Sequence, residues 1–284
     1  MSTPARRIAL LTHQRVAETR PAVEKLVAAV CAAGGEVFVE PAEAAKHGLD
    51  GCKVVDDLVA QGVDAAVALG GDGTMLTTLR KFAGTGAPVF TFNFGAVGFL
   101  ATVEPNDVDD GIRRLLEGDY VTLELPTLVI EPHVGRRIAV NDVAFQRRSG
   151  SRVAQLAYAV RGEEIARARC DGVVISTPVG STGYNLANGG PVVAWGVEGY
   201  IVSYIAPHTL TARTLVAAKS DILVVTNLAE EESVDVVTDG QLACTLEPGN
   251  QLEVCFDDHP ALLAKIAGTG FYEQLVGKFG ALAS

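Results

Sequence analysis

Short apolar runs alternate with amphipathic stretches along the first part of the chain. Ile8–Thr12, Glu36–Glu40 and Asp64–Leu69 are rich in apolar and β-branched residues, whereas Pro21–Ala33 and Cys52–Gln61 mix apolar and polar positions. Continuous apolar strands separated by helices are typical of a parallel sheet that is covered on both faces. The pattern therefore predicts a βαβαβ arrangement, with the two amphipathic stretches as its helices.

Two further elements extend this region. Pro88–Asn93 predicts another strand, and Pro105–Glu117 predicts a helix that stops at Gly118, as Gly34–Gly35 stops the first helix. We therefore predict an α/β lobe with a Rossmann-like parallel sheet over roughly residues 1–118.

From Tyr120 onward the pattern changes to short strands broken by Gly, Pro or charged turns. The predicted strands are Val121–Ile130, Arg137–Gln146, Gln155–Val160, Gly172–Ser176, Tyr200–Ile205, Ile222–Thr226, Val234–Thr238 and Leu252–Phe256. Runs of strands after a βαβ half indicate a separate β-rich lobe, here over residues 119–268. Phe271–Phe279 predicts a short helix, and we expect residues 269–284 to pack back on the first lobe.

The composition is that of a globular protein. The chain has 284 residues, of which 48% are hydrophobic and 20% charged, and domains of about 100–200 residues favour two lobes. The net charge of −11 argues against a general affinity for nucleic acid or for anionic membranes. An anionic ligand must therefore be held by a local arrangement.

The cysteines and the N-terminus bear on the cellular compartment. The five cysteines are widely spaced without a C-x-x-C pair, and we interpret them as reduced core thiols. No apolar run approaches the roughly 20 residues that span a bilayer, and Arg6–Arg7 is interpreted as a charged lead-in to the first strand rather than an export signal. We expect a cytoplasmic protein with neither a membrane nor a nucleic acid as partner.

The sharpest local feature is Gly70–Thr74 (GGDGT), which lies between the strand Asp64–Leu69 and the amphipathic stretch Met75–Phe82. Glycines let a backbone approach an anion closely, and the free N–H groups at a helix start point toward it. Because the carboxylate of Asp72 would repel a phosphate, it should bind a metal, bond to a sugar hydroxyl or act as a base. A plain tight turn is the alternative, and the segment matches neither of the standard nucleotide fingerprints.

Two more glycine-rich segments follow predicted strands. Asn93–Leu100 should lie at the same carboxyl edge of the sheet, where open α/β sheets bind ligands, although Phe94, Phe99 and Leu100 are interpreted as packing residues. Cys170–Pro191 leads from a buried strand into a loop dense in hydroxyls and glycines, which suits ribose and phosphate oxygens. In that loop Tyr184 could flank a base ring or belong to the core.

Polar residues also interrupt the β-rich half. Asn141 and Asp142 stand inside the strand-like run Arg137–Gln146, and such a break in local rules marks either function or a bulge. Six arginines cluster in an otherwise acidic chain, most of them on a solvated face, and one or two near Asp171 could reach the phosphates of a dinucleotide. The six are Arg147, Arg148, Arg152, Arg161, Arg167 and Arg169.

Together these segments resemble the NAD kinase family. Gly70–Thr74 matches its GGDGT motif, Asn93–Leu100 resembles its N-x-G-x-x-GFL segment, and Asp171–Pro191 resembles its DG…TPTGSTAY…GGP stretch. Order and spacing agree across roughly residues 65–215. The GGDG turn also occurs in diacylglycerol-type lipid kinases and, as GGDGS, in phosphofructokinases, but the long Thr177–Tyr184 motif favours NAD kinase.

The resemblance implies transfer of the γ-phosphoryl of ATP, or of polyphosphate in some members, to the 2′-hydroxyl of the adenosine ribose of NAD, giving NADP. It implies an active site in the cleft between the lobes and Asp72 as the general base. The donor phosphates would be held by Gly70, Gly71, Gly73 and Thr74. NAD would be bound by Asp72, Gly73, Asn141, Asp142, Arg152, Arg169, Asp171, Thr182, Gly183, Tyr184, Asn185, Leu186, Ala187 and Gln241.

Three residues depart from the family pattern. Asp142 stands where the family usually has Glu, Gly183 replaces the usual Ala, and Val179 replaces the usual Thr. The first change shortens the reach by one methylene and the last removes a hydroxyl, while none of them touches Asp72.

The resemblance also implies an ion and an assembly. Mg²⁺ is expected, held mainly through substrate phosphates because no compact carboxylate cage is visible in the sequence, and relatives form homodimers or homotetramers through the β-rich lobe. Two alternatives stay open at this point. A lipid kinase is disfavoured by the net charge of −11, and a non-catalytic NAD or NADP sensor on the same fold is disfavoured by the intact Gly70–Thr74 turn.

Overall fold

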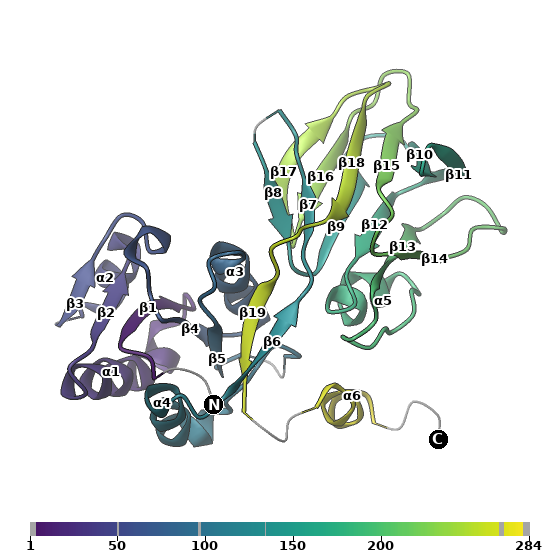
Figure 1. Ribbon diagram of the computed structural model, residues 1–284. Coiled ribbons are helices and arrows are strands. Elements are labelled where there is room, and N and C mark those ends of the chain that lie inside the picture. The colour runs from purple at the N-terminus through teal and green to yellow at the C-terminus, as the bar shows by residue number, and fades with distance from the viewer. Residues whose placement is uncertain (1–3, 50, 96–97, 134, 267–269, 281–284) are drawn as a thin grey trace. The chain divides into compact units, whose positions relative to one another are not determined.

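The computed structural model describes residues 4–49, 51–95, 98–133, 135–266 and 270–280. The chain divides into two compact units (Figure 1). Unit 1 comprises Met1–Glu124 with Ala261–Ser284, and unit 2 comprises Leu125–Pro260. Unit 1 is therefore built from both ends of the chain.

Unit 1 contains one sheet with helices around it. Over the described residues the sheet has seven strands in the order β3-β2-β1-β4-β5-β19-β6. The strands are β1 (Arg7–Thr12), β2 (Glu36–Val39), β3 (Cys52–Val54), β4 (Ala65–Gly70), β5 (Val89–Asn93), β6 (Val121–Leu125) and β19 (Ala261–Lys265). The helices are α1 (Val16–Ala32), α2 (Pro41–His47), α3 (Asp72–Phe82), α4 (Val108–Glu117) and α6 (Phe271–Phe279), with 3-10 turns η1 (Val59–Gln61) and η2 (Pro105–Asp107).

The core of unit 1 confirms the predicted parallel sheet. β1 pairs in parallel with β2 and β4, and β4 pairs in parallel with β5. All six residues of β4 are buried, as expected for a strand that is covered on both faces. Because the order reverses between β1 and β4, the carboxyl ends of these two strands form the switch point where such sheets bind ligands.

One predicted helix of unit 1 is wrong. Cys52–Gln61 forms the short strand β3 and the turn η1, while the helix of that crossover, α2, lies earlier at Pro41–His47. Pro41 occupies the first helical turn, where its missing N–H costs nothing, and Gly48 ends the helix at φ 58°. The seven residues of α2 make about two turns, and apolar spacing over so short a stretch does not distinguish a helix from a loop in sequence alone.

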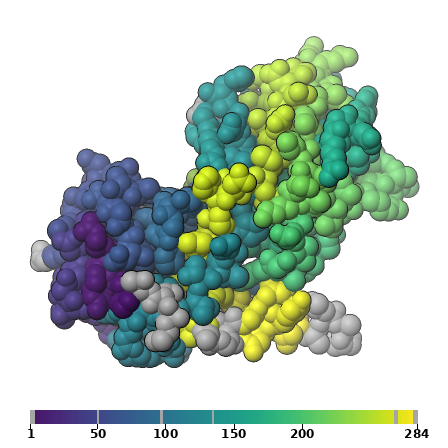
Figure 2. All heavy atoms as spheres, in the orientation of Figure 1, coloured from purple at the N-terminus to yellow at the C-terminus, as the bar shows by residue number. Residues whose placement is uncertain are grey.

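The C-terminal part of the chain returns to unit 1. β19 pairs in parallel with β5 through Leu263 and Val89, and it lies beside β6 in the sheet (Figures 1 and 2). The sequence pattern placed the lobe boundary near residue 118 and residues 261–268 in the β-rich lobe. In the structure β6 and β19 are instead neighbouring strands of the first sheet.

Unit 2 consists of two antiparallel sheets. Over the described residues each sheet has six strands, in the orders β11-β10-β15-β18-β7-β8 and β14-β13-β12-β9-β16-β17. The strands are β7 (Leu128–Ile130), β8 (Arg137–Ala139), β9 (Asp142–Arg147), β10 (Ala154–Val160), β11 (Glu163–Cys170), β12 (Gly172–Ser176), β13 (Gly199–Ile205), β14 (Leu215–Ala218), β15 (Leu223–Asn227), β16 (Val234–Thr238), β17 (Gln241–Leu246) and β18 (Gln251–Phe256). One short helix, α5 (Tyr184–Ala187), follows the turn η3 (Gly180–Thr182).

The two sheets of unit 2 share one core. Leu156 and Val225 from the first sheet and Phe145, Val173 and Tyr200 from the second belong to a single cluster of buried residues. The unit is therefore a sandwich whose inner faces interdigitate.

Two predicted strands of this half are each two strands in the structure. Val121–Ile130 divides into β6 of unit 1 and β7 of unit 2, and Arg137–Gln146 divides into β8 and β9. β8 and β9 lie in different sheets, so the chain crosses the sandwich at Val140 and Asn141. The polar pair Asn141–Asp142 thus marks the point where one strand ends and the next begins.

Cysteine burial only partly follows the prediction. All five cysteines are free, but Cys170 is buried while Cys31 is exposed. The interpretation as core thiols is therefore wrong for Cys31. In the described part of the chain, no helix combines the length and the apolar character needed to cross a membrane.

Candidate functional site

The GGDGT segment forms a turn between a buried strand and a helix, as its sequence predicts. Gly70 ends β4, Gly71 is the extended N-cap residue of α3, and Asp72 is the first helical residue. A Cβ on Gly70 would lie 2.5 Å from the Thr74 hydroxyl oxygen, and a Cβ on Gly95 would lie 2.7 Å from the Gly71 Cα. Glycine is therefore required for the turns after β4 and β5 to approach each other.

The first turn of α3 is open to an anion. No side chain caps the helix, because glycine at the N-cap has none to offer. Thr74 and Met75 donate their backbone N–H groups to the Gly71 carbonyl at 3.0 and 3.2 Å. The start of an eleven-residue helix with its positive dipole end and without a capping side chain suits a phosphate.

Asp72 is held from the neighbouring loop. Its Oδ2 accepts a hydrogen bond from the Phe99 backbone N–H at 3.3 Å, and a Cβ on Gly98 would come within 1.6 Å of its Oδ1. Oδ1 is buried and has no hydrogen-bond partner among the described residues. The carboxylate thus has one oxygen bound by the loop backbone and one buried against Gly98 without a hydrogen-bond partner.

Burial is the largest influence on the Asp72 carboxyl and raises its pKa. The positive charge of Lys278 and the backbone N–H groups of Phe99 and Leu100 act in the opposite direction. Because a general base must be ionised yet basic, burial opposed by a nearby cation suits that role.

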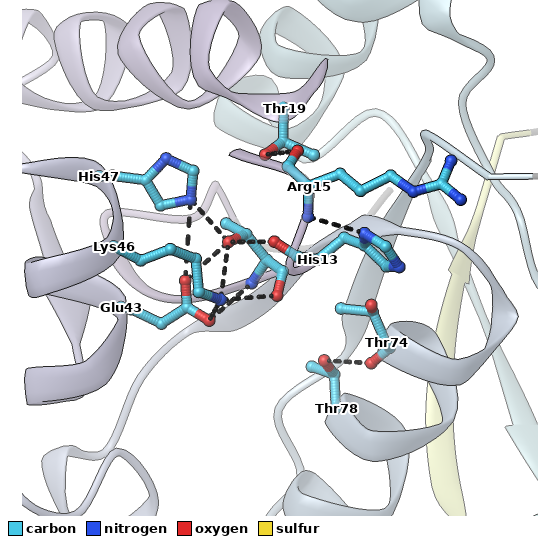
Figure 3. Close-up of polar contacts among 9 residues, drawn as sticks. His13, Arg15, Thr19, Glu43, Lys46, His47, Thr74 and Thr78 are labelled. Atoms are coloured by element: carbon cyan, nitrogen blue, oxygen red, sulfur yellow. Dashed lines mark hydrogen bonds and ion pairs between the residues drawn. The ribbon is translucent and has the colours of Figure 1, made fainter. Parts of the chain in front are cut away.

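A pocket lies beside the first turn of α3, at the carboxyl ends of β1 and β4. The cavity of about 570 Å³ is lined by Leu11, Thr12, His13, Gln14, Ala42, Glu43, Lys46, Gly73, Thr74 and Thr77. In Figure 3 the His13 ring lies next to Thr74, and Lys46 and Glu43 reach toward the end of β1. This wall of the site was not predicted from sequence.

Glu43 and Lys46 fix α2 to the end of β1. Thr12 donates its hydroxyl to Glu43 Oε2 at 2.7 Å, and Lys46 Nζ donates to Glu43 Oε1 at 2.7 Å and to the Thr12 carbonyl at 3.1 Å. His47 Nε2 lies 2.7 Å from the Thr12 hydroxyl, and burial lowers the pKa of His47. The cluster therefore holds a neutral imidazole and an internally paired lysine, and it shapes the pocket wall.

The second glycine-rich segment is mainly structural where it is described. Asn93, at the end of β5, accepts a hydrogen bond from the Gly95 N–H at 3.1 Å and donates to Glu104 at 3.0 Å. Phe99 and Leu100 are buried, which agrees with their interpretation as packing residues. Ala96 and Val97 of the same segment lie outside the described residues.

In unit 2 the Thr177–Tyr184 loop packs against the crossing at Asn141. Thr177 donates its hydroxyl to the Val140 carbonyl at 2.7 Å and its N–H to the Asn141 carbonyl at 2.9 Å. A Cβ on Gly180 would lie 2.1 Å from that same carbonyl oxygen. The glycine is therefore what allows the two predicted segments to meet.

Asp239 organises this meeting point and was not predicted. It stands at φ 46°, before Gly240 at φ 77°, in the two-residue hairpin between β16 and β17. Its carboxylate accepts the backbone N–H groups of Val140, Asn141 and Asp142 at 2.9, 2.8 and 3.2 Å. The Asp-Gly dipeptide between two strand-like runs is a hairpin signal that could have located the turn, though not its partner.

Asp142 is buried close to that carboxylate. Burial, together with the negative charge of Asp239, raises the pKa of Asp142 to about 7. Partial burial raises the pKa of the Tyr184 phenol, and the nearby charges of Asp142 and Asp171 add to this effect. Asn141, Asp142, Asp171 and Tyr184 are thus brought into one neighbourhood.

The other predicted site residues of unit 2 differ in burial and in whether their side chains already have partners within the unit. Asn185 is fully buried, with its amide donating to Ser181 and Pro191 carbonyls and accepting from Ser203, so its side chain holds the loop together. Arg152 and Arg169 are exposed and form no ion pair with any described residue, whereas Asp171 pairs with Arg147 at 2.7 Å. Thr182 and Leu186 are half-buried, and Gly183, Ala187 and Gln241 are exposed.

The comparisons with known proteins cover both units. The model of the ATP-NAD kinase N-terminal domain matches residues 8–120, and that of the ATP-NAD kinase C-terminal domain matches residues 140–266. The NAD kinase of Gemmatimonas aurantiaca is 35% identical over 77% of this chain and 78% of its own length. The chain belongs to the NAD kinase family. It is a kinase that phosphorylates NAD with ATP as donor.

Further relatives extend the match over nearly the whole kinase. The NAD kinase of Symbiobacterium thermophilum is 32% identical over 89% of this chain and 91% of its own length. The structure of the Archaeoglobus fulgidus NAD kinase in complex with ATP has a TM-score of 0.75 at 25% identity, covering 96% of this chain and 97% of that one. The yeast NADH kinase structure, with a TM-score of 0.87 at 21% identity over 99% and 89% of the two chains, shows the same fold. The lipid-kinase and sensor alternatives are not favoured by these matches.

Proposed function

We propose that this kinase transfers the γ-phosphoryl group of ATP to the 2′-hydroxyl of the adenosine ribose of NAD, giving NADP and ADP. The observation that carries the proposal is the carboxylate of Asp72, with one oxygen held by the Phe99 N–H and the other unpartnered, at the uncapped start of α3. Phosphoryl transfer to an alcohol needs a base for the hydroxyl proton and a binding site for the donor phosphates. Asp72 combines the two, because its carboxylate lies at a helix start that suits an anion.

Asp72 acts in this proposal as the general base. Its carboxylate accepts the proton of the 2′-hydroxyl while the hydroxyl oxygen bonds to the γ-phosphorus, and the bond from that phosphorus to the bridging oxygen of ADP breaks. Gly70, Gly71, Gly73 and Thr74 bind the donor phosphates. The absence of a capping side chain on α3 supports this role.

NAD is bound, we propose, by side chains and backbone of unit 2 together with Asp72 and Gly73. The neighbourhood of Asn141, Asp142, Asp171 and Tyr184 supports this assignment. The further residues are Arg152, Arg169, Thr182, Gly183, Asn185, Leu186, Ala187 and Gln241. Because the Asn185 side chain is saturated within the unit, we propose that it acts by holding the loop. The predicted position of the site in the cleft between the lobes stays a prediction.

Mg²⁺ enters the proposal with the donor. Among the described residues no three His, Cys, Asp or Glu side chains converge in the way that a protein cage for an ion requires. We therefore propose that the phosphate oxygens of the donor hold the Mg²⁺ ion. The ion would neutralise negative charge on these phosphates during transfer. Polyphosphate would present the same terminal phosphoryl group, so we propose it as an alternative donor.

The reaction is tested by incubating the purified protein with Mg-ATP and NAD. A dehydrogenase that accepts only NADP detects the product, and NADH and polyphosphate replace NAD and ATP in parallel reactions. NADP formation is the expected result. Measurable NAD binding without product from any donor would contradict the proposal and favour a sensor.

The base is tested by Asp72→Asn. The variant should lose about 10²–10⁴-fold in turnover, the range for losing acid–base catalysis, with NAD affinity largely retained. The exposed Asp56 provides the matched control, since Asp56→Asn should turn over as the wild type does. Near-normal turnover of Asp72→Asn would overturn the assignment.

We also propose a cytoplasmic homodimer or homotetramer that assembles through unit 2. Exposed apolar side chains on that unit support an interface, with Leu210, Leu242 and Val216 exposed by 98%, 66% and 52%. Sedimentation equilibrium of the whole chain tests the assembly, and a monomer at micromolar concentration would contradict it.

A further inference from the structure

Helix α6 packs on the loop that holds Asp72. The ring of Phe99 lies between two aromatic side chains of α6, with centroids 6.5 Å from Phe271 and 5.7 Å from Phe279. Leu275 of the same helix is buried. The helix therefore contacts the residue whose backbone N–H binds the Asp72 carboxylate.

Polar contacts tie the same helix to the loop backbone. With its amide oriented to satisfy both neighbours, Gln274 donates to the Phe99 carbonyl at 3.1 Å and accepts from Lys265 Nζ, at the end of β19, at 2.8 Å. Both carbonyl and N–H of Phe99 are thus engaged, the first by α6 and the second by Asp72. A shift of α6 must move the hydrogen bond to Asp72.

Lys278 completes this arrangement with a charge. Its Nζ lies 3.9 Å from the centroid of the Phe99 ring, a geometry in which an ammonium is attracted to the ring face. The side chain is half-buried, so its charge is screened less than that of a surface lysine. The charged groups around it are Asp72 of α3, Glu104 before η2 and Lys265 of β19.

We propose that Lys278 is a positioning residue for Asp72: it holds Phe99 from α6, and its positive charge favours the ionised form of the carboxylate that Phe99 binds. The inference rests on the proposed function of Asp72 as base. It assigns to the last helix of the chain a role in the chemistry of the GGDGT turn.

The electrostatic balance at Asp72 agrees with this geometry. Burial raises the pKa of Asp72 and the Lys278 charge lowers it. In turn burial lowers the pKa of Lys278, while Asp72 and Glu104 raise it. Removing the lysine charge leaves only the backbone N–H groups of Phe99 and Leu100 to oppose the effect of burial, so the Asp72 carboxyl should hold a proton to higher pH.

The pH profile of turnover separates this role from a merely structural one. Lys278→Met should move the acidic limb of kcat to higher pH by about one unit, so that activity is lost most at low pH and recovers as the pH rises. Lys278→Arg should restore the limb. Lys25→Met, on the exposed surface of α1, is the control and should leave the limb unchanged.

A second readout does not depend on activity. In protein labelled with ¹³C-aspartate, the carboxyl resonance of Asp72 is identified by its absence in Asp72→Asn and is titrated directly. Its titration should move upward in Lys278→Met and in Lys278→Gln, and not in Lys278→Arg. An unmoved titration in folded Lys278→Met overturns the inference even if NADP is formed, whereas absence of NADP from the wild type overturns the proposed function alone.

Discussion

Two carboxylic acids of unit 2 occupy one small region, and each has a different environment. Asp239 is surrounded by three backbone N–H groups that stabilise its negative charge. Asp142 is 6% exposed and has no such donors among the described residues, and the charge of Asp239 acts against its ionisation. The pair therefore divides the roles, with Asp239 ionised as a clamp and Asp142 holding its proton to about pH 7.

This division predicts a pH dependence of stability. The native state keeps the Asp142 proton to about pH 7, while an unfolded chain releases it near pH 4, so the native state binds more protons between these values. The free energy of unfolding therefore falls as the pH rises through this window. Asp142→Asn removes the titration and should be more stable than the wild type at pH 8 by roughly 4 kcal/mol, with the difference vanishing near pH 4.

Thermal unfolding of both proteins across pH 4–8 measures this difference. Asp171→Asn is the control, because Asp171 is paired with Arg147 and not deeply buried. Parallel pH curves for Asp142→Asn and the wild type would show that Asp142 is ionised throughout.

At the scale of elements, the structure is organised by short connections whose partners lie far along the chain. The hairpin between β16 and β17 holds the crossing between β8 and β9 through Asp239, about a hundred residues away. The same crossing receives the loop after β12 through Thr177. Three loops of unit 2 therefore depend on one side chain for their relative position.

Asp239→Asn tests that dependence. Asn-Gly also favours the hairpin turn, but the amide NH₂ replaces an acceptor oxygen opposite backbone donors. We expect a loss of roughly 1–3 kcal/mol in the free energy of unfolding and a raised KM for NAD with a smaller change in kcat. Asp235→Asn on the adjoining strand β16 is the control, since within the described part of the chain Asp235 forms an ion pair only with the surface residue Arg148. Wild-type stability and KM in Asp239→Asn would contradict the clamp.

At the scale of the whole molecule, unit 2 is an insertion into the sheet of unit 1. The chain leaves that sheet after β6 and re-enters it at β19, which is the neighbouring strand. Within unit 2 the two ends of the segment also lie together, because Asp257 donates its N–H to the Thr127 carbonyl at 2.9 Å. An inserted segment with adjacent ends and its own core is expected to fold by itself.

Residues 125–260 expressed alone should therefore unfold in one cooperative transition, followed by circular dichroism. Residues 1–124 alone lack β19, which separates β5 from β6 in the sheet, and should not form a stable fold without residues 261–284. A cooperative transition in the shorter N-terminal piece, or none in the 125–260 piece, would contradict this division.

Much of this kinase could be predicted from its sequence. Buried strands such as β4 and the GGDGT turn are specified by neighbouring residues, because apolar periodicity and glycine act over a few positions. The edge strand β11 was missed because its sequence, Glu163–Cys170, is charged and largely exposed. Helix α2 was missed because its seven residues carry too little periodicity. Motifs indicated Asp72 and the Thr177–Tyr184 loop, and a polar break in a strand-like run indicated Asn141, as site candidates, and their roles stay predictions.

The sequence by itself determined the turns to which we assign the chemistry, because a glycine or a carboxylate at a strand end has local consequences. Only the tertiary structure decided what surrounds them: β19 within the first sheet, Asp239 bound to the Asn141 N–H, and Lys278 on the ring of Phe99, whose N–H binds Asp72. Those partners are separated from their targets by about a hundred residues or more. Their placement depends on burial and packing across the whole unit, for which no local pattern exists.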